Sequence, residues 1–156
     1  MELNKQTQEF IEKLGLTFER MHSTRTAGRM MGLLLVADRP LSLAEMAELL
    51  QVSKASTSTN ARMAEQTGMA HRVSFPGDRR DYYELTPSSF EQMAIHDIQG
   101  IHRLVHLADE GKSAVGDDNT VARTRLETMK EFYEFFVGEL EASLDQWRNR
   151  DHNRHE

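Results

Sequence analysis

The sequence of 156 residues contains no cysteine. This absence excludes disulfides, thiolate zinc sites, iron–sulfur clusters, cysteine nucleophiles and thiol-based redox sensing. No apolar run approaches the ~20 residues of a membrane helix, and residues 1–5 lack the apolar region of a secretory signal. Because there are only 3 prolines and 9 glycines, long irregular loops are not expected. The sequence therefore predicts a soluble, helix-rich, cytoplasmic protein with one domain, or one domain plus a helical extension.

An overall basic charge, the usual footprint of a nucleic-acid-binding protein, is also lacking. Acids outnumber bases by 25 to 19, which gives a formal net charge of -6. The excess is uneven, because residues 1–86 hold 11 bases and 11 acids whereas residues 87–156 hold 8 and 14. Residues 53–80 carry five bases against two acids, a net charge of +3. Although the whole chain is acidic, residues 53–80 therefore have a charge that suits DNA.

The first quarter of the chain predicts two helices. The first, over residues 2–20, is amphipathic, with an apolar face of Phe10, Ile11, Leu14 and Phe18. The second, over residues 25–37, is apolar nearly all round and should be buried. It contains Gly28 and Gly32, four residues apart, which predict the close approach of another helix.

Two shorter helices follow, joined by a tight turn. Ser42 and Glu45 match the capping-box pattern, so the first of these helices starts directly after Ser42. The turn, residues 51–53, ends at Ser53, which is expected to cap a helix over residues 54–67. Two helices of this length with a three-residue turn predict a helix-turn-helix.

A β-hairpin is predicted directly after these helices. Residues 69–75 and 81–85 alternate apolar and polar side chains, and residues 76–80 between them indicate a turn. A helix-turn-helix followed by a hairpin is the order of elements in a winged helix. The predicted fold is therefore mainly α with a small β-hairpin wing, a winged helix-turn-helix with additional N- and C-terminal helices.

Two long helices are predicted for the rest of the chain, over residues 88–108 and 120–148, with a polar break at 111–119. The second helix carries apolar residues at spacings of 4, 3, 4, 3, 4, 4 and 3, close to a heptad seam. A small winged helix cannot cover so long a seam, so a second copy of the chain is the expected partner. The seam consists of Ala122, Leu126, Met129, Tyr133, Phe136, Leu140, Leu144 and Trp147.

The helix over residues 54–67 has one face that can pack and one that suits DNA. Small residues, Thr57, Ala61 and Ala64, share the first face and allow a close approach to the preceding helix. The opposite face combines small hydroxyls, an amide and a guanidinium, which can enter the major groove and pair with guanine or phosphate. It consists of Ala55, Thr59, Arg62 and Gln66, flanked by Ser56 and Ser58, with Lys54 at the N-terminus.

Three arginines on the predicted hairpin add to this surface. Arg79 and Arg80 form its tip and Arg72 lies on the strand before it, where they can reach phosphates or the minor groove. A solvated helix face and a surface ion-pair cluster are the alternatives for the two features. Their coincidence on the two elements that a winged helix presents to DNA favours DNA binding.

Four motifs in residues 28–85 carry a family resemblance. They are GR-x-x-GLLL, PLSL-x-E-x-A-x-x-L, VSK-x-S-x-S-x-N-x-R and GDRRDYYE. This segment resembles the GbsR-like branch of the MarR superfamily of bacterial and archaeal transcription regulators. The resemblance implies a homodimer that binds a pseudo-palindromic operator, with the N- and C-terminal helices in the dimer interface. It maps Ser53, Lys54, Ser56, Ser58, Thr59, Asn60 and Arg62 onto the recognition helix, and Arg79 and Arg80 onto the wing.

The chain departs from this family in the core of the recognition helix. The family tends to place large aliphatic residues where this sequence has Thr57, Ala61 and Ala64. A slimmer core predicts a recognition helix with a different tilt.

We therefore predict a homodimeric, sequence-specific DNA-binding transcriptional regulator, a repressor rather than an activator, with no enzymatic activity and no cofactor. The predicted domains are an N-terminal packing helix (1–24), the DNA-binding winged helix (25–87), the dimerisation helices (88–148) and a polar tail (149–156). The DNA-binding residues are Ser53, Lys54, Ser56, Ser58, Thr59, Asn60, Arg62, Arg72, Arg79 and Arg80. The dimerisation residues are Phe10, Leu14, Leu126, Met129, Tyr133, Phe136, Leu140, Leu144 and Trp147.

Three alternatives stay open at this point. A winged helix can serve as a protein-interaction module, although such modules usually lack a basic wing tip. His102 and His106 have the i, i+4 spacing of metal ligands, but the chain is rich in histidine and no metal is predicted. An aromatic cage for a quaternary ammonium effector is the alternative to dimer core for Phe132, Tyr133, Phe135, Phe136 and Trp147.

Overall fold

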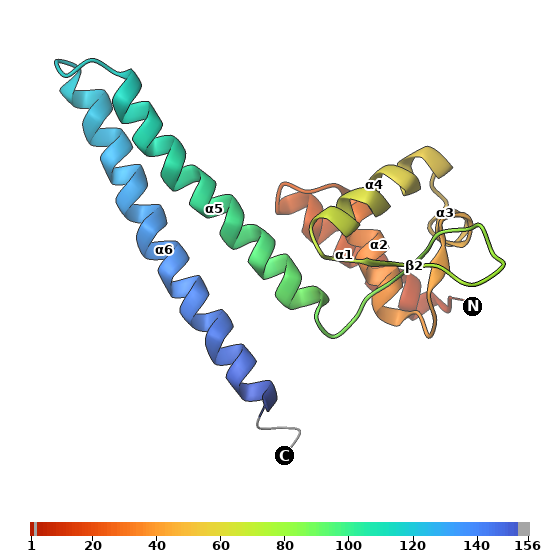
Figure 1. Ribbon diagram of the computed structural model, residues 1–156. Helices are drawn as coiled ribbons and strands as arrows, with labels where there is room; N and C mark the ends of the chain where they lie inside the picture. The colour runs from red at the N-terminus through yellow and green to blue at the C-terminus, as the bar shows by residue number, and fades with distance from the viewer. Residues whose placement is uncertain (2, 153–156) are drawn as a thin grey trace. The chain divides into compact units, whose positions relative to one another are not determined.

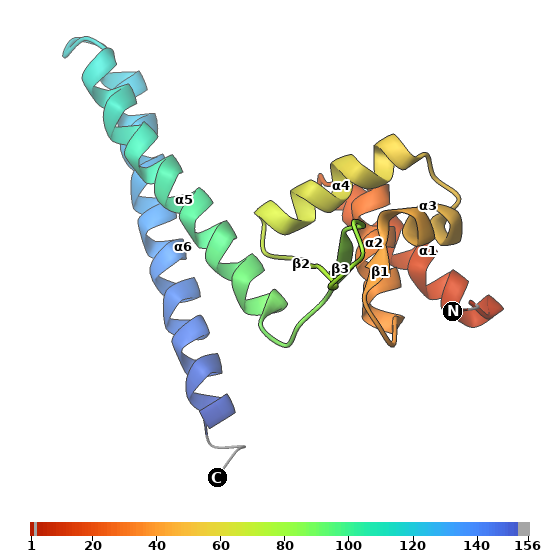
Figure 2. The same ribbon diagram turned by 45° about the vertical axis from the view of Figure 1, so that its right-hand side comes forward.

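The computed structural model describes residue 1 and residues 3–152. It divides into two compact units, the first from Met1 to Met93 and the second from Ala94 onward (Figures 1 and 2). None of the described helices is long and apolar enough to cross a membrane. The elements are α1 (Lys5–Arg20), α2 (Arg25–Val36), β1 (Leu41–Ser42), α3 (Leu43–Leu50), α4 (Lys54–Gln66), β2 (His71–Val73), β3 (Tyr82–Glu84), α5 (Ser89–Ala114) and α6 (Thr120–His152).

Helices α1 and α2 approach each other at the level of the backbone. A Cβ atom added to Gly28 would lie 2.7 Å from the carbonyl oxygen of Leu14, and one added to Gly32 would lie 3.2 Å from the Cα of Ile11. The close approach predicted from Gly28 and Gly32 is confirmed, and α1 is the partner. Gly15 of α1 contributes to the same contact, because a Cβ there would come within 2.6 Å of a side chain of α2.

Arg29 ties three helices of the first unit together. Its Nη2 donates to the carbonyl oxygen of Leu50 at 2.6 Å, and its Nε lies 2.6 Å from Oε1 of Glu12. A guanidinium at the last carbonyls of α3 satisfies groups that the helix itself leaves unbonded. The core around this contact consists of Ile11, Met30, Met31, Leu33, Leu34, Leu41, Met46, Leu50, Ala61, Ala64, Met69, Ala70 and Tyr83.

The sheet has three antiparallel strands in the order β1-β3-β2, with Leu41 opposite Tyr83 and Val73 opposite Tyr82. The predicted hairpin is present, but its strands are shorter than 69–75 and 81–85. Met69 is buried in the core before the strand begins. The sequence did not predict β1, because two residues are too few to show an alternating pattern.

Ser42 ends β1 and also caps α3. Its Oγ accepts from the backbone N–H of Glu45, whose carboxylate accepts from the backbone N–H of Ser42 at 2.8 Å, so the predicted capping box is confirmed. Arg39 pairs with the same carboxylate at 2.6 Å. The hydrogen bonds from Arg39 and Ser42 lower the pKa of Glu45 to about 2.

Three helix boundaries differ from those expected. Helix α1 begins at Lys5 rather than at residue 2, because Asn4 accepts the N–H of Thr7 and caps the helix there. Helix α5 continues beyond residue 108 to Ala114, and α6 continues beyond residue 148. Gly111 lies inside α5, where an added Cβ would be 3.0 Å from Leu126 of α6. This glycine therefore marks a close helix approach rather than a break.

Polar side-chain contacts follow the antiparallel register of α5 and α6 in the second unit. Lys112 pairs with Glu127, Asp109 with Lys130 at 2.8 Å, and His102 with Glu141 at 2.9 Å. The partner numbers rise along α6 as those along α5 fall, which is the pattern of a helical hairpin. These contacts lie at the surface, so we expect each to stabilise the hairpin only slightly.

The packed seam of α6 differs in part from the predicted heptad seam. Val137 is buried, with Ile98 and Ala108 of α5, whereas Phe136 and Trp147 are exposed. The heptad seam was predicted to contact a second copy of the chain, so the exposure of Phe136 and Trp147 within a single chain does not contradict it.

The contact at Gly28 should make substitution there costly. Gly28→Ala places a methyl group against the backbone of α1, so we expect a loss of about 1–3 kcal/mol in the free energy of unfolding. Gly138→Ala is the matched control, since a Cβ there meets nothing within 4 Å and alanine favours a helix by about 1 kcal/mol. Urea denaturation at one fixed protein concentration measures both. Equal stabilities would contradict the role of the glycine contact.

Candidate nucleic-acid interface

Helix α4 presents the two faces that its sequence predicts. Ser53 caps it, its Oγ accepting the N–H of Ser56 at 3.1 Å. The small residues Thr57, Ala61 and Ala64 are buried against the rest of the first unit. The exposed face consists of Ala55, Thr59, Arg62 and Gln66.

The predicted DNA-binding residues of α4 share its solvent side, with one exception. Ser53, Lys54, Thr59 and Arg62 are exposed, while Ser56 and Ser58 are half-buried at the edges of that side. The Nε of Arg62 makes a long 3.4 Å contact to the carbonyl oxygen of Ser58, which leaves most of the guanidinium open. This side of α4 therefore offers hydroxyls, an amide and two cations without bulky side chains.

Asn60 is the exception. Its residue surface is only 7% exposed, and its side-chain amide is already used. The Oδ1 accepts from the hydroxyl of Thr24 at 2.7 Å, and the Nδ2 donates to the carbonyl oxygen of Ser56 at 2.9 Å. One N–H and one lone pair of the amide are thus used within the protein, and burial leaves little of the side chain for a base. The structure therefore does not favour Asn60 as a DNA-contacting residue.

Asp78 organises the wing between β2 and β3. Its carboxylate accepts from Nε and Nη2 of Arg80, the latter at 2.6 Å, and from the hydroxyl of Tyr82 at 2.8 Å. The guanidinium also lies 5.3 Å from the centre of the Tyr82 ring. Gly77 supplies the left-handed turn, with φ of 80°. The hydrogen bonds from Arg80 hold the pKa of Asp78 well below its usual range.

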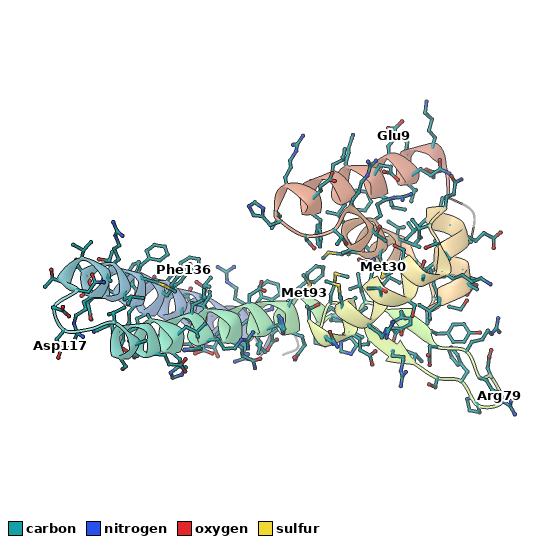
Figure 3. The ribbon with its side chains drawn as sticks, turned by 90° about the horizontal axis from the view of Figure 1, so that it is seen from above. Glu9, Met30, Arg79, Met93, Asp117 and Phe136 are labelled. Atoms are coloured by element: carbon teal, nitrogen blue, oxygen red, sulfur yellow. The ribbon has the colours of Figure 1, made fainter. Side chains whose placement is uncertain are left out.

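The three wing arginines are held to different degrees. Arg80 is fixed by Asp78 but its side chain is still 64% exposed. Arg72 has only long ion contacts, 3.8 Å to Glu65 and 3.6 Å to Asp81. Arg79 lies at the tip of the wing and makes no ion pair with any described residue (Figure 3). The wing is thus a shaped loop with exposed cations, which suits phosphate binding.

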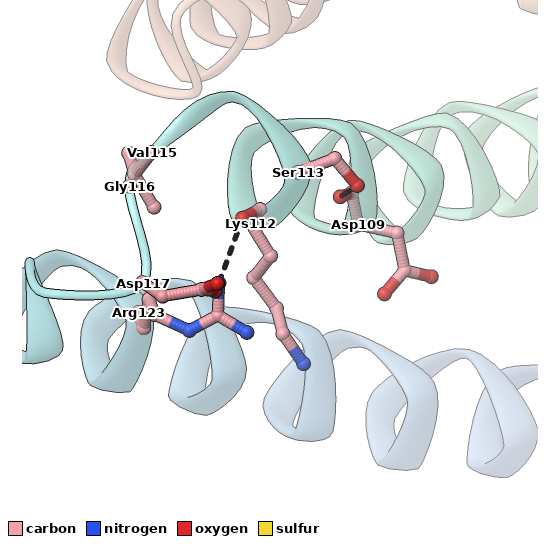
Figure 4. Close-up of a pocket in the computed structure, with 7 residues that line it drawn as sticks. All are labelled: Asp109, Lys112, Ser113, Val115, Gly116, Asp117 and Arg123. Carbon is pink, nitrogen blue, oxygen red and sulfur yellow. Dashed lines mark hydrogen bonds and ion pairs between the residues drawn. The ribbon is translucent and has the colours of Figure 1, made fainter.

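The loop between α5 and α6 forms an open polar pocket of about 500 Å³ (Figure 4). It is lined by Asp109, Lys112, Ser113, Val115, Gly116, Asp117 and Arg123. Its charged side chains already have partners, since Arg123 bonds to Asp117 at 3.0 Å and to the carbonyl oxygen of Lys112 at 3.2 Å. Paired charges in a shallow pocket give no sign of a ligand site.

The two weaker candidates gain no support from the geometry. His102 contacts Glu141, and the described part of the chain contains no group of three side chains that could hold a metal. Phe132 contacts the rings of Tyr133 and Phe136, at 5.3 and 6.0 Å between centroids. These aromatic side chains follow one another along α6, and Phe132 is 58% exposed.

The predicted dimerisation residues fall into two groups. Phe10, Phe136 and Trp147 are exposed. The others are half-buried, and two of them have partners within the chain: Leu14 packs against the core of the first unit, and Leu126 packs against Gly111. The half-buried group consists of Leu14, Leu126, Met129, Tyr133, Leu140 and Leu144.

Comparisons with known proteins agree with this architecture. A family model described as an MmpR5-like MarR family transcriptional regulator matches residues 88–150. The chain is 36% identical over 143 residues to the HTH-type transcriptional regulator MmpR5 of Mycobacterium tuberculosis (strain H37Rv), covering 91% of this chain and 87% of that protein. A crystal structure of a transcriptional regulator matches with a TM-score of 0.85 and 35% identity, covering 92% of this chain and 99% of that chain.

The arrangement in the wing predicts a difference between its two neighbouring arginines. Arg80→Ala removes the guanidinium hydrogen bonds that contribute most to lowering the pKa of Asp78, so that pKa should rise part of the way towards the ordinary value of about 3.9, while the backbone N–H of residue 80 and the hydroxyl of Tyr82 still donate to the carboxylate. Arg79→Ala should leave it unchanged, because Arg79 does not contact Asp78. Carboxyl ¹³C NMR titration measures both. Because the pKa is depressed, the Asp78–Arg80 pair persists as the pH falls through 3.9 and is lost only below it. An equal rise in both variants would contradict the assigned pairing.

Proposed function

The chain belongs to the MmpR5-like MarR family of transcriptional regulators, and we propose that it acts as a homodimeric, sequence-specific DNA-binding repressor. The observation that carries this proposal is the surface shared by α4 and the wing. Both elements belong to the first unit, both are exposed, and together they hold Lys54, Arg62, Arg72, Arg79 and Arg80. The acids of the second unit lie on other elements, so the net charge of -6 does not describe this surface.

In the proposed complex, α4 enters the major groove. Arg62 is placed to pair with the O6 and N7 atoms of guanine, and Thr59 offers a small hydroxyl beside it. The N-terminal amides of α4 and Lys54 suit a phosphate. The wing adds Arg79 and Arg80 as phosphate or minor-groove contacts, which position the protein without reading most bases.

Repression would follow from competition with polymerase at a promoter. A two-fold dimer would bind half-sites about one helical turn apart, ~10 base pairs, and any change in the spacing of the two α4 helices would weaken that fit. The resemblance of residues 28–85 also points to the GbsR-like branch of the superfamily, and this finer assignment stays a prediction.

The exposed aromatic strip on α6 supports the homodimer. Phe132, Phe135, Phe136 and Trp147 are all exposed on this helix. Large apolar side chains that cluster on a surface usually mark an interaction site. A second copy presents the same strip, so a two-fold arrangement would cover both at once.

Substitutions should separate base reading from phosphate binding. Arg62→Ala should weaken binding to the operator by about 1–3 kcal/mol and relax its sequence preference. Arg79→Ala combined with Arg80→Ala should weaken binding to most sequences and lower the salt slope by up to about 2. Fluorescence anisotropy on fragments that the wild type selects from its genome, at several salt concentrations, measures both.

The control for this experiment is Arg123→Ala, which removes a cation already paired with Asp117. It should leave DNA affinity unchanged. A wild-type protein that shows only non-specific affinity would refute sequence-specific regulation. Failure of the wild type to bind heparin would favour the protein-interaction module instead.

The aromatic strip makes a separate prediction about assembly. Phe132→Ser combined with Phe136→Ser should convert a dimer to a monomer in light scattering, because both rings are already exposed in the single chain. Met63→Gln, at an exposed apolar residue of α4, is the matched control and should stay dimeric. A dimer that survives the double substitution would place the interface elsewhere.

A further inference from the structure

One directional contact joins α4 to the corner between α1 and α2. Thr24 caps α2, its Oγ1 accepting the N–H of Ala27 at 3.0 Å. The same hydroxyl donates to Oδ1 of Asn60 at 2.7 Å, across 36 residues of sequence. Asn60 is turned so that its Nδ2 donates to the carbonyl oxygen of Ser56 within α4. The amide is thus held at both ends.

Within the described part of the chain, the other buried residues of α4 make no directional contact that would fix the rotation of the helix. Thr57, Ala61 and Ala64 are small, and the Thr57 hydroxyl donates to the carbonyl of Ser53 in the preceding turn rather than to another element. Contacts among methyl groups are non-directional, so they permit a helix to rotate slightly or slide. A buried polar pair has fixed geometry and is best attested as a device that sets register.

A rotation of α4 would matter for base reading. Side-chain ends lie roughly 5–6 Å from a helix axis, so a rotation of about 20° displaces them by on the order of 2 Å. Hydrogen bonds tolerate only a few tenths of an ångström in donor–acceptor distance. Phosphate contacts through flexible wing arginines tolerate such a shift better than a bidentate contact to a base.

We propose that the Thr24–Asn60 hydrogen bond sets the rotation of α4, which makes Asn60 a positioning residue for sequence-specific recognition. This inference rests on the proposed function. It assigns to Asn60 a role distinct from contact with DNA, and it makes the α1–α2 corner part of the recognition apparatus.

The other end of α4 is restrained as well. Gly68 has φ of 72°, and an added Cβ would lie 2.5 Å from the Cβ of Gln92 at the start of α5. This contact limits sliding at the C-terminal end, and the Thr24–Asn60 bond limits rotation nearer the N-terminus. The recognition helix is therefore positioned between two elements that lead into the helices outside the winged helix.

The test compares affinity for a selected operator with affinity for a scrambled duplex of equal length. Asn60→Leu removes the bond with little change in volume, and Thr24→Ala removes it from the partner side together with the cap of α2, which by itself should lower stability but not the affinity ratio. Both should lower the ratio of operator to scrambled affinity by about 10-fold, comparable to the loss of one good base contact. Affinity for the scrambled duplex should change by less than about 2-fold, since phosphate contacts dominate it.

Two matched controls separate this bond from ordinary packing. Thr24→Ser keeps the hydroxyl and should keep the wild-type ratio. Thr67→Val removes a hydroxyl whose hydrogen bonds among the described residues go to the carbonyl oxygens of Met63 and Ala64 in α4, and should also keep it. Circular dichroism and thermal melting establish that each variant is folded. If Asn60→Leu does not fold, Thr24→Ala at its exposed position decides the result alone.

The outcomes distinguish the inference from the function on which it rests. A wild-type protein without preference for any fragment refutes the proposed function. A specific wild type together with a folded Asn60→Leu or Thr24→Ala variant of unchanged ratio refutes the positioning role alone. A parallel loss of operator and scrambled affinity, with a lowered melting temperature, also refutes it, because that pattern belongs to a purely structural bond.

Discussion

The glycine contact between α1 and α2 is the constraint on which the first unit depends. Because no side chain separates the two backbones at Gly28, α2 is fixed against α1 and can bury Met30 and Leu33 completely. Arg29, on the same helix, then holds the end of α3. The small buried residues of α4 pack against this frame. Strand β2 then follows α4 in the chain. The position of the candidate DNA-binding surface is thus set by a helix pair that lies outside it.

Much of this architecture follows from short local signals in the sequence. Ser42 and Glu45 give the start of α3, and Gly68 gives the end of α4, because caps depend on residues within one turn. Contacts with a distant partner were not predicted. Gly111 was expected to break a helix, since sequence cannot show that Leu126 lies opposite. The bond between Asn60 and Thr24 was missed for the same reason, as the two lie 36 residues apart.

The sequence predicts which elements form the candidate interface, but it does not predict the partner of each charged side chain. Helical periodicity separates the buried and exposed faces of α4, so Arg62 could be assigned from spacing alone. In the wing, Asp78 has an arginine one residue away and another two residues away, and composition gives no preference between them. The turn at Gly77 decides that Arg80 returns to the carboxylate while Arg79 does not. Counting charges in the sequence therefore does not show which arginine is already paired with a carboxylate.

The composition of α4 has a consequence for its own dynamics. Residues 56–60 are five consecutive hydroxyl or amide residues, and such side chains compete with the backbone for hydrogen bonds and favour non-helical states. A helix of 13 residues with this composition would be largely unfolded as an isolated peptide. Its helical order therefore depends on the packing of Thr57, Ala61 and Ala64 against the rest of the first unit, so a substitution in the frame beneath α4 should disturb the candidate interface without touching any of its exposed residues.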